Sequence, residues 1–305
     1  MKRQREDPKL DINLSLKCAG LNIPTMDPHC MAVLTYFKFI GVKPGRIDNR
    51  PSTKQPYFAY EDISNDKQTK TIEGTRKIID YVRSQQPPSK YDLDVGLKAK
   101  QRSKHIATTS YILDIMMPCV LYIMWCDGKN YQQTTKPSYK EGLPILRGWY
   151  EPYAMHLRVR KQIFDMFGTE VTKEDIYKSL LNGLLMLDAL VSVDKNFMIL
   201  NTPTSLDAYA YGVLSCLAYP NYKDQSINSI LSKFPKLVAY CQMITKTYFE
   251  PDAIKQDNQF KEAKTLNDIK LQLALERDQK TKSYVFLAAS VAALSLPMLL
   301  RVFLK

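Results

Sequence analysis

Apolar positions in the first third of the chain follow patterns that predict alternating strands and helices. The short apolar run at residues 14–23 is typical of a strand, and prolines follow it. Residues 30–40 carry large apolar side chains with few polar ones and end at a glycine, which predicts a helix. A strand at 57–60 and a helix over 72–82 complete the order. This order predicts a small α/β lobe.

The rest of the body has helical periodicity almost throughout. Two prolines within Gln85–Lys90 fix φ and remove two hydrogen-bond donors, which indicates a linker between two domains. Beyond the linker, an apolar stripe recurs at helical spacing within residues 94–125 and predicts one long helix. Further helices are predicted at about 153–167, 173–193, 206–217 and 228–249.

The start of the helix at 206–217 carries a local signal in the sequence Thr-Ser-Leu-Asp. The hydroxyl of Thr204 is expected to cap the helix through the amide of Asp207, whose carboxylate returns a bond to the amide of Thr204. Such a capping box contributes about 1 to 2 kcal/mol to stability. Thr204 and Asp207 are therefore predicted to be structural residues without a catalytic role.

A run without any charge lies near the end of the chain, at Tyr284–Leu300, between Lys282 and Arg301. A bilayer core needs ~17 to 25 apolar residues of helix, and basic ends reach the headgroups. The run predicts a transmembrane tail anchor, although a buried helix of a soluble protein has the same pattern. Residues 252–282 predict an amphipathic helical neck, either a spacer or a partner-binding face. The anchor residues are Tyr284, Leu287, Val291, Leu294, Leu299 and Arg301.

Composition adds a strong positive charge to this picture. Lysine and arginine number 43 against 31 acidic residues, which gives a net charge of +12. The charge favours anionic surfaces, but the basic runs lack the interleaved aromatics and glycines of a nucleic-acid-binding module. The polar first residues, MKRQREDPKL, are followed by no apolar stretch of signal-peptide length. An organelle address is therefore expected in the basic-flanked tail.

Cysteine and histidine positions predict neither a metal site nor a cofactor site. The six cysteines form no Cys-x-x-Cys pair and no zinc spacing, so free thiols in the core are expected. Cys119 and Cys126 lie seven residues apart on one helix face, where apolar surroundings keep a thiol unreactive. His29, His105 and His156 are scattered along the sequence, so no metal cluster is expected.

Four segments, in order along the chain, resemble the metaxin family. Residues 23–42 are similar to the family's first helix, which carries a cysteine and a Tyr-x-Lys-Phe-x-Gly sequence. Residues 125–131, WCDGKNY, resemble its Trp-x-Asp-x-x-Asn-Tyr sequence, and residues 202–215 resemble its Pro-x-Ser-Leu-Asp-Ala segment. Residues 237–249 are similar to its final core helix. The general layout, an α/β domain followed by a helical domain with a Thr-x-x-Asp capping box, also resembles glutathione transferases.

The resemblance implies an α/β thioredoxin-like N-terminal domain plus an all-α glutathione-transferase-like C-terminal domain, followed by a single C-terminal transmembrane helix. On this fold Pro56 is expected to be a structural cis-proline. The expected division is 1–13 polar N-terminal extension, 14–86 thioredoxin-like domain, 87–251 helical transferase-like domain, 252–282 amphipathic helical neck and 283–305 transmembrane tail anchor.

The resemblance further implies a non-enzymatic, membrane-anchored scaffold that acts in mitochondrial outer-membrane protein import and β-barrel assembly. Its body would face the cytosol, and its partners would be other protein subunits, including a second metaxin-like protein, and membrane lipid around the C-terminal helix. No nucleic acid and no small-molecule substrate is expected. Two alternatives stay open. One is a structural accessory subunit of a large mitochondrial membrane complex such as a respiratory complex, which would allow the inner membrane. The other is a membrane-anchored glutathione transferase.

Catalysis is not expected, because the groups that a glutathione transferase needs are missing. Such an enzyme places a hydroxyl or thiol at the start of its first helix and uses a Glu/Gln-Ser pair to hold a carboxylate. Thr25 and Cys30 lie near the first position, but Cys30 is expected inside the helix. At the second position Glu73 is followed by Gly74. No catalytic or cofactor-binding residue is therefore assigned.

Aromatic residues crowd one stretch of the helical part. Such density indicates either an interface anchor or core filling, and the sequence leaves both readings open. The residues concerned are Tyr131, Tyr139, Trp149, Tyr150 and Tyr153.

Overall fold

The structure is a computed structural model, and it falls into two units. One unit is Met1–Ala253 and the other is Ile254–Lys305. The predicted neck and tail anchor, together with Pro56 and Cys18, lie outside the described residues. The described residues are 10–16, 20–42, 44–48, 57–61, 69–85, 88–141, 143, 145–192 and 195–249.

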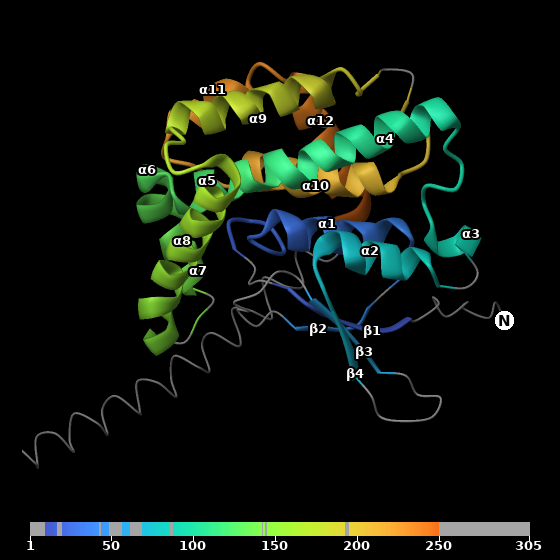
Figure 1. The fold of residues 1–305 in the computed structure, drawn as a ribbon, viewed down its shortest axis with the longest axis horizontal. Coiled ribbons are helices and arrows are strands. Elements are labelled where there is room, and N and C mark those ends of the chain that lie inside the picture. Colours follow the sequence, from blue (N-terminus) through green and yellow to red (C-terminus); the bar gives the residue numbers. More distant parts are fainter. Residues whose placement is uncertain are drawn as a thin grey trace, which may run out of the picture. The chain divides into compact units, whose positions relative to one another are not determined.

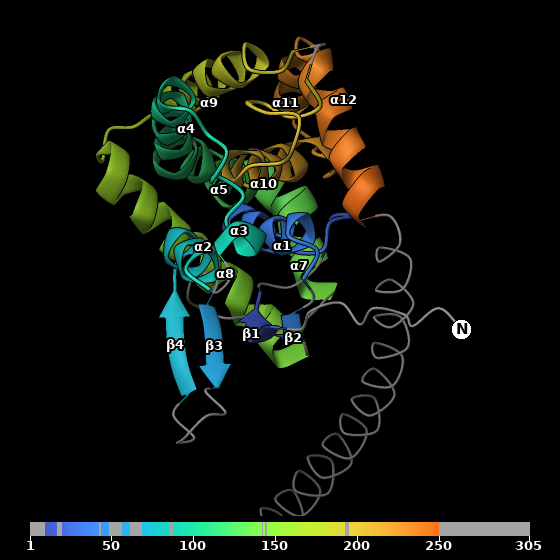
Figure 2. The same cartoon turned by 90° about the vertical axis from the view of Figure 1, so that its right-hand side faces the viewer.

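A four-stranded sheet of order β2-β1-β3-β4 forms the first layer of the body (Figure 2). Strand β1 (Leu10–Ser15) pairs in parallel with β2 (Pro44–Asp48). It also pairs antiparallel with β3 (Tyr57–Glu61), which in turn pairs antiparallel with β4 (Thr69–Glu73). Strands β2 and β4 have no counterpart among the predicted elements, because each contains one isoleucine and otherwise no large aliphatic or aromatic residue.

The first strand lies earlier than predicted. It ends at Ser15, whereas the prediction ran over 14–23. Residues 11–15 alternate polar and apolar side chains, the pattern of a strand with one buried face. The more apolar stretch after it forms an isolated bridge between Gly20 and Ile23 instead of a strand. For this strand, the alternation of polar and apolar residues therefore indicates the position better than the number of apolar residues does.

Two helices of the α/β part lie between the sheet and the other helices (Figure 1). Helix α1 (Pro28–Phe39) agrees with the prediction to within two residues at its start. Helix α2 (Thr75–Arg83) begins after Gly74, which has a φ of 100°, so the preceding residues of the predicted helix belong to β4. The short helix α3 (Pro88–Tyr91) follows near the predicted linker.

One long helix runs from Ala99 to Trp125. It comprises α4 (Ala99–Tyr111), a π-helical turn (Ile112–Met116) and α5 (Met117–Trp125). The π-helical turn ends two residues before Pro118, whose missing N–H interrupts the regular hydrogen-bonding pattern. By length and composition this helix could cross a membrane, but α5 is almost entirely buried against other helices of the body, as expected of a core helix.

The remaining helices differ from the predictions mainly at their ends. Helix α8 begins eight residues before the predicted start and continues through Pro152. The helix predicted at 228–249 is divided, because Pro235 begins a new helix. The bounds are α6 (Gly128–Asn130), a π-helical turn (Tyr131–Thr135), α7 (Lys136–Glu141), α8 (Ile145–Phe167), α9 (Lys173–Asp188), α10 (Ser205–Ala218), α11 (Gln225–Leu231), α12 (Pro235–Ile244) and a final π-helical turn (Thr245–Phe249).

Helix α10 is the centre of the core. It packs on α1 on one side and contacts α4, α5, α11 and α12 around the rest of its surface (Figure 2). The crossing with α1 is close, because a Cβ atom placed on Gly212 would lie 2.5 Å from the carbonyl oxygen of Pro28 and 3.1 Å from the Cβ of Ala32. Thirteen residues of α10, from Ser205 to Leu217, are buried. The α/β part and the helical part therefore share one core.

Candidate functional site

The start of α1 is where a glutathione transferase would place a reactive hydroxyl or thiol. Asp27 is the N-cap, and its Oδ1 accepts hydrogen bonds from the amides of His29 (2.9 Å) and Cys30 (3.1 Å). Cys30 is the third residue of α1 and is buried, so it lies inside the helix as expected and not at an exposed end. Thr25, Asp27 and Cys30 are all buried. A carboxylate of the chain itself thus occupies the amides that would bind an anion or thiolate.

The N-terminus of α2 contacts the N-terminus of α1. Gly74 is its N-cap and provides no side-chain bond. The next residue, Thr75, is buried, and its hydroxyl lies 3.1 Å from Nδ1 of His29. The two helix starts that could together form a carboxylate site therefore contact each other. Neither Thr25 nor Cys30 is exposed to take part in thiol chemistry.

The described cysteines are free thiols, and most of them are buried. Burial raises the pKa of Cys119 to about 12. Burial likewise raises the pKa of Cys126 to about 12, against a smaller opposing effect of Arg160. Both thiols stay protonated at neutral pH and are poor nucleophiles, in agreement with the prediction for this helix face.

A buried polar cluster joins the loop before α4 to the start of α10. Asp94 accepts hydrogen bonds from the Ser205 amide (2.9 Å) and the Ser205 hydroxyl (2.6 Å). His105 Nε2 lies 2.9 Å from the same hydroxyl. Burial acts to raise the pKa of Asp94, but the hydrogen bonds and charge of His105 and the hydrogen bonds of Ser205 outweigh it, and the pKa falls to about 2. No local sequence pattern predicts this cluster, because its members lie far apart along the chain.

These three residue types also occur in serine hydrolases, but the geometry here differs. In a catalytic triad the histidine lies between the serine and the acid and takes the proton of the serine. In this cluster the Ser205 hydroxyl donates directly to Asp94, and the same nitrogen of His105 faces both groups, at 2.9 Å from the Ser205 hydroxyl and 3.5 Å from Asp94 Oδ1. The cluster therefore holds two segments together and does not activate a nucleophile.

A hollow of about 300 Å³ opens beside this cluster and is lined by three arginines. Arg83 Nε donates to Asp92 at 2.8 Å, and its Nη1 lies 3.5 Å from Asp94. Arg102 donates to the carbonyl of Asp94, and Arg76 donates to the hydroxyl of Ser110, both at 3.4 Å. Each guanidinium bonds to a group of the chain, but only Arg83 is paired with carboxylates, and the acceptors of Arg76 and Arg102 carry no charge.

The predicted pair at the start of α10 is brought together in the core. Asp207 Oδ2 accepts from the amide of Thr204 (2.8 Å) and from its hydroxyl (2.6 Å). Its other oxygen accepts from the amide of Met198 (2.9 Å) and the hydroxyl of Tyr240 (2.6 Å). The last two bonds reach other segments and were not foreseen. Burial raises the pKa of Asp207, and these hydrogen bonds oppose the rise.

The outer face of α8 is the largest set of exposed apolar side chains among the described residues. Its members recur at spacings of three and four residues, so they form one line along the helix. We call this line the α8 stripe. It consists of Leu146 (81% exposed), Trp149 (79%), Tyr150 (59%), Tyr153 (59%) and Leu157 (44%).

The crowded aromatic residues thus divide between the two readings. Tyr131 and Tyr139 are buried and contact Trp125, at ring-centroid distances of 6.2 Å and 5.0 Å. The aromatic residues of the α8 stripe are exposed instead. Helical spacing from 146 to 157 was available as a signal, but Pro152 concealed it by suggesting that the helix starts after the proline.

The three histidines are separated in the fold as they are in the sequence. His29 contacts Thr75, His105 contacts Ser205, and His156 Nδ1 lies 2.7 Å from the carbonyl oxygen of Trp125. Within the described part of the chain, no three His, Cys, Asp or Glu residues gather in a way that could hold a metal ion.

Comparison with known families gives two matches. Residues 30–156 match a family described as outer mitochondrial membrane transport complex protein (Tom37). Residues 184–244 match the C-terminal domain of glutathione S-transferases. The first match covers all but the first two residues of α1 and most of the α8 stripe, and the second covers α10 and α12.

Relatives among curated proteins carry one family name. Metaxin-1 of Sus scrofa is 27% identical over 241 residues, which cover 75% of this chain and 73% of that protein. Metaxin-3 of Xenopus laevis is 26% identical over 255 residues, or 78% of each chain.

Among solved structures, a glutathione S-transferase of Ceriporiopsis subvermispora in complex with glutathione has a similar fold. The TM-score is 0.52 at 14% sequence identity, and the match covers 80% of this chain and all of that one. The fold is therefore that of the glutathione transferases.

Proposed function

The chain belongs to the metaxin family, and from this premise we propose that it is a non-catalytic, protein-binding component of a transport complex in the mitochondrial outer membrane. The family description and the metaxin relatives support the location and the complex. The finer role that we propose is a scaffold in protein import and β-barrel assembly, with a second metaxin-like protein among its partners.

The absence of catalysis is proposed because the N-terminus of α1 is buried and its free amides are already bonded. A transferase on this fold needs an accessible group there to stabilise a thiolate. Here the buried Asp27 carboxylate takes the amides of His29 and Cys30, and the hydroxyl of Thr75 faces His29. An anionic ligand at this place would have to displace a buried carboxylate of like charge.

We propose further that the chain is held in the membrane by the uncharged run Tyr284–Leu300 and that its body faces the cytosol. The length of the run and its flanking basic residues support this assignment. The domain division at about residue 87 belongs to the same proposal. It is supported by the change from strands to helices after α2.

Two measurements test the proposal. The first is glutathione-agarose retention of the full chain with a thiol-conjugation assay, beside an active transferase of the same fold. We expect no retention and no turnover. Turnover that is abolished by Thr25→Ala or Cys30→Ala would contradict the non-catalytic role and would support the membrane-anchored transferase.

The second measurement is purification of the endogenous protein from mitochondria in mild detergent. Co-migration with barrel-insertion components is the expected result. Co-migration with respiratory subunits would instead support a structural subunit of an inner-membrane complex. Extraction with alkaline carbonate checks the anchor, because release of the intact chain into the supernatant would exclude it.

A further inference from the structure

We propose that the α8 stripe docks onto a bilayer surface that contains anionic phospholipids, so that the body of the protein lies against the membrane along this helix. The inference deepens the proposed function, since it rests on the chain working at a membrane. It concerns a surface of the described body and is separate from the predicted tail anchor.

The buried face of α8 fixes the direction in which the stripe points. Met155, Val159 and Ile163 are at most 4% exposed and belong to the core cluster. Helix α8 packs on α5 and α7 through this side. With one face held in the core, the opposite face cannot turn inward, and its apolar residues stay in contact with water unless another surface covers them.

The chemistry of the stripe fits the boundary between headgroups and acyl chains. Tryptophan and tyrosine combine an apolar ring with a polar atom, and they are enriched where a membrane meets water. Leu146 and Leu157 lie at the two ends of the stripe and add aliphatic area. The stripe is about 16 Å long at the rise of an α-helix, which suits a helix lying in the plane of the interface.

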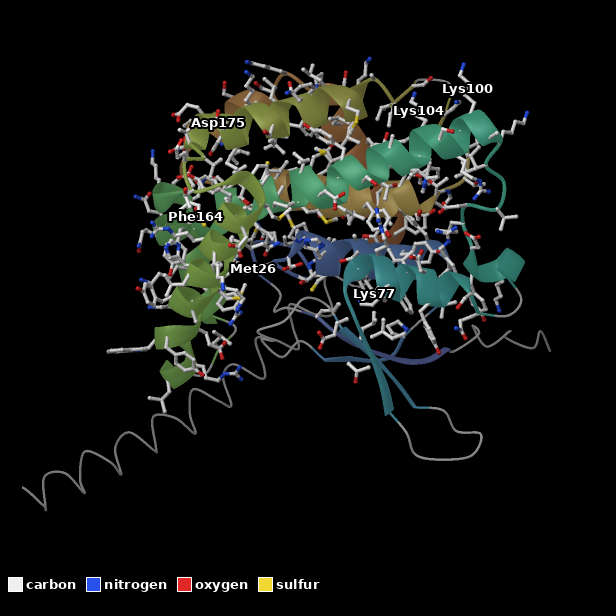
Figure 3. The ribbon with its side chains drawn as sticks, viewed as in Figure 1. Met26, Lys77, Lys100, Lys104, Phe164 and Asp175 are labelled. Carbon is white, nitrogen blue, oxygen red and sulfur yellow. The ribbon has the colours of Figure 1, made fainter. Side chains whose placement is uncertain are left out.

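Beyond Leu157, the same side of α8 carries positively charged side chains. Arg160 and Lys161 follow Leu157 by three and four residues and are exposed. The Arg160 guanidinium lies 5.2 Å from the ring centroid of Phe164. Figure 3 shows Phe164 on α8. On the neighbouring helix α7, Lys140 is exposed, and its side chain packs against Gly148 on the core side of α8, so it adds charge near the stripe but not on its face.

Among the described residues, exposed acidic groups beside the stripe are fewer than basic ones. Glu151 is buried, and its carboxylate accepts a hydrogen bond from Arg147 at 2.5 Å. Asp165 is exposed four residues after Lys161, so it borders the basic end of the helix face. Glu141 is exposed on α7 next to Lys140. The balance is therefore positive, which complements anionic lipid and disfavours a basic protein partner.

A second basic region allows a matched comparison. Lys100 and Lys104 lie near the start of α4, on the opposite side of the view from Phe164 (Figure 3). They are exposed like Arg160 and Lys161. Of the large apolar residues near them, Ile106 is exposed, but no exposed aromatic side chain accompanies it. Charge alone therefore does not distinguish the two regions, whereas the aromatic stripe does.

The two tryptophans of the chain provide a direct readout. Trp125 is buried and Trp149 is exposed, and the sequence contains no other tryptophan. The full chain is reconstituted into vesicles of phosphatidylcholine with or without phosphatidylglycerol. Phospholipids brominated near the headgroup end of the acyl chain serve as quenchers. The difference between the unmodified chain and Trp149→Phe isolates the signal of Trp149.

We expect Trp149 to be quenched by the brominated lipids, and more strongly when phosphatidylglycerol is present. Arg160→Glu together with Lys161→Glu should reduce the quenching severalfold. The control, Lys100→Glu together with Lys104→Glu, makes the same change of charge at the other end of the body and should leave the quenching unchanged. Circular dichroism establishes that each variant is folded.

Three outcomes would overturn the inference. Trp149 could remain unquenched by lipid and fully accessible to acrylamide in both kinds of vesicle. Its quenching could be independent of lipid charge and of Arg160 and Lys161. It could also be shielded only when a partner protein is added in detergent, which would make the stripe a protein interface. None of these outcomes would alter co-migration with a transport complex or the conjugation assay, so a failure here is distinguishable from a failure of the proposed function.

Discussion

The buried N-termini of the core helices and the outer face of α8 differ in what their side chains contact. Asp27, Asp94 and Asp207 are at most 2% exposed, and each accepts hydrogen bonds from groups of the fold itself. The α8 stripe presents large aromatic and aliphatic side chains to solvent. The contrast teaches that a fold shared with enzymes can close its helix starts with its own carboxylates.

Among the substitutions considered for the buried helix N-termini, removing the carboxylate of Asp207 should lower the free energy of unfolding most. Asp207→Ala leaves the amides of Met198 and Thr204 and the hydroxyl of Tyr240 buried without an acceptor. We expect a loss of about 3 to 5 kcal/mol in the free energy of unfolding, measured by urea denaturation.

The control is Asp175→Ala, which removes the acid of a similar capping box at the start of α9. Asp175 is exposed and bonds only to Thr172 among the hydrogen bonds described here. We expect a loss of about 1 kcal/mol. Equal losses in the two variants would show that burial and the additional donors contribute nothing.

The crossing of α1 and α10 should be nearly as sensitive. Gly212→Val places a side chain where the Pro28 carbonyl and Ala32 already lie. Overpacking of this kind should cost about 3 kcal/mol and be visible as a lower melting temperature. Gly128→Val is the control, because no atom lies within 4 Å of a Cβ placed there. A drop of the same size in the control would mean that the crossing is not the cause.

The Asp94 cluster should make the free energy of unfolding fall as the pH is lowered. The pKa of Asp94 is lowered from 3.8 to about 2 in the folded state, so the unfolded state binds the proton more tightly. The corresponding stabilisation, about 2 kcal/mol, is present above about pH 4 and is lost as the pH falls toward 2.

Comparing unfolding of the unmodified chain and Asp94→Asn across this range measures the contribution. The variant should lack the part of the pH dependence that Asp94 supplies. Parallel curves for the two proteins would rule out the assignment of the cluster as a structural clamp that depends on ionised Asp94.

Substitutions on the α8 stripe should have the smallest effect on folding. Trp149→Ser and Tyr153→Ser remove exposed side chains, so stability should change by no more than about 0.5 kcal/mol. Met155→Ser, on the buried face of the same helix, should cost several times more. Thermal denaturation of the three variants checks this order. A large loss for Trp149→Ser would mean that the stripe packs within the fold.

Sequence patterns predicted the order of the elements better than their ends. The helices around α5 and α10 were found because their apolar residues recur over several turns. Strands β2 and β4 were missed, because each is held by pairing with neighbours and has little apolar content of its own. Start and end positions shifted where Gly74 and Pro235 set boundaries that periodicity does not register.

The polar contacts were predictable only where they are local. Thr204 and Asp207 are three residues apart, so their interaction could be expected from the sequence. Asp94 and Ser205 are separated by 111 positions, and no local pattern brings them together. The exposure of Trp149 likewise depends on which face of α8 packs on α5, and this is a property of the assembled core.

Because α1 packs against α10, which is far along the chain, α1 cannot be fully packed until most of the body has been synthesised. Pro28 leaves the ribosome early, whereas Gly212 must be synthesised before the two backbones can meet. At ~5 to 20 residues per second, the first helix waits on the order of ten seconds or more with its apolar face uncovered. An apolar helix face that stays exposed during synthesis favours aggregation, so this interval is the period in which the nascent chain is most vulnerable.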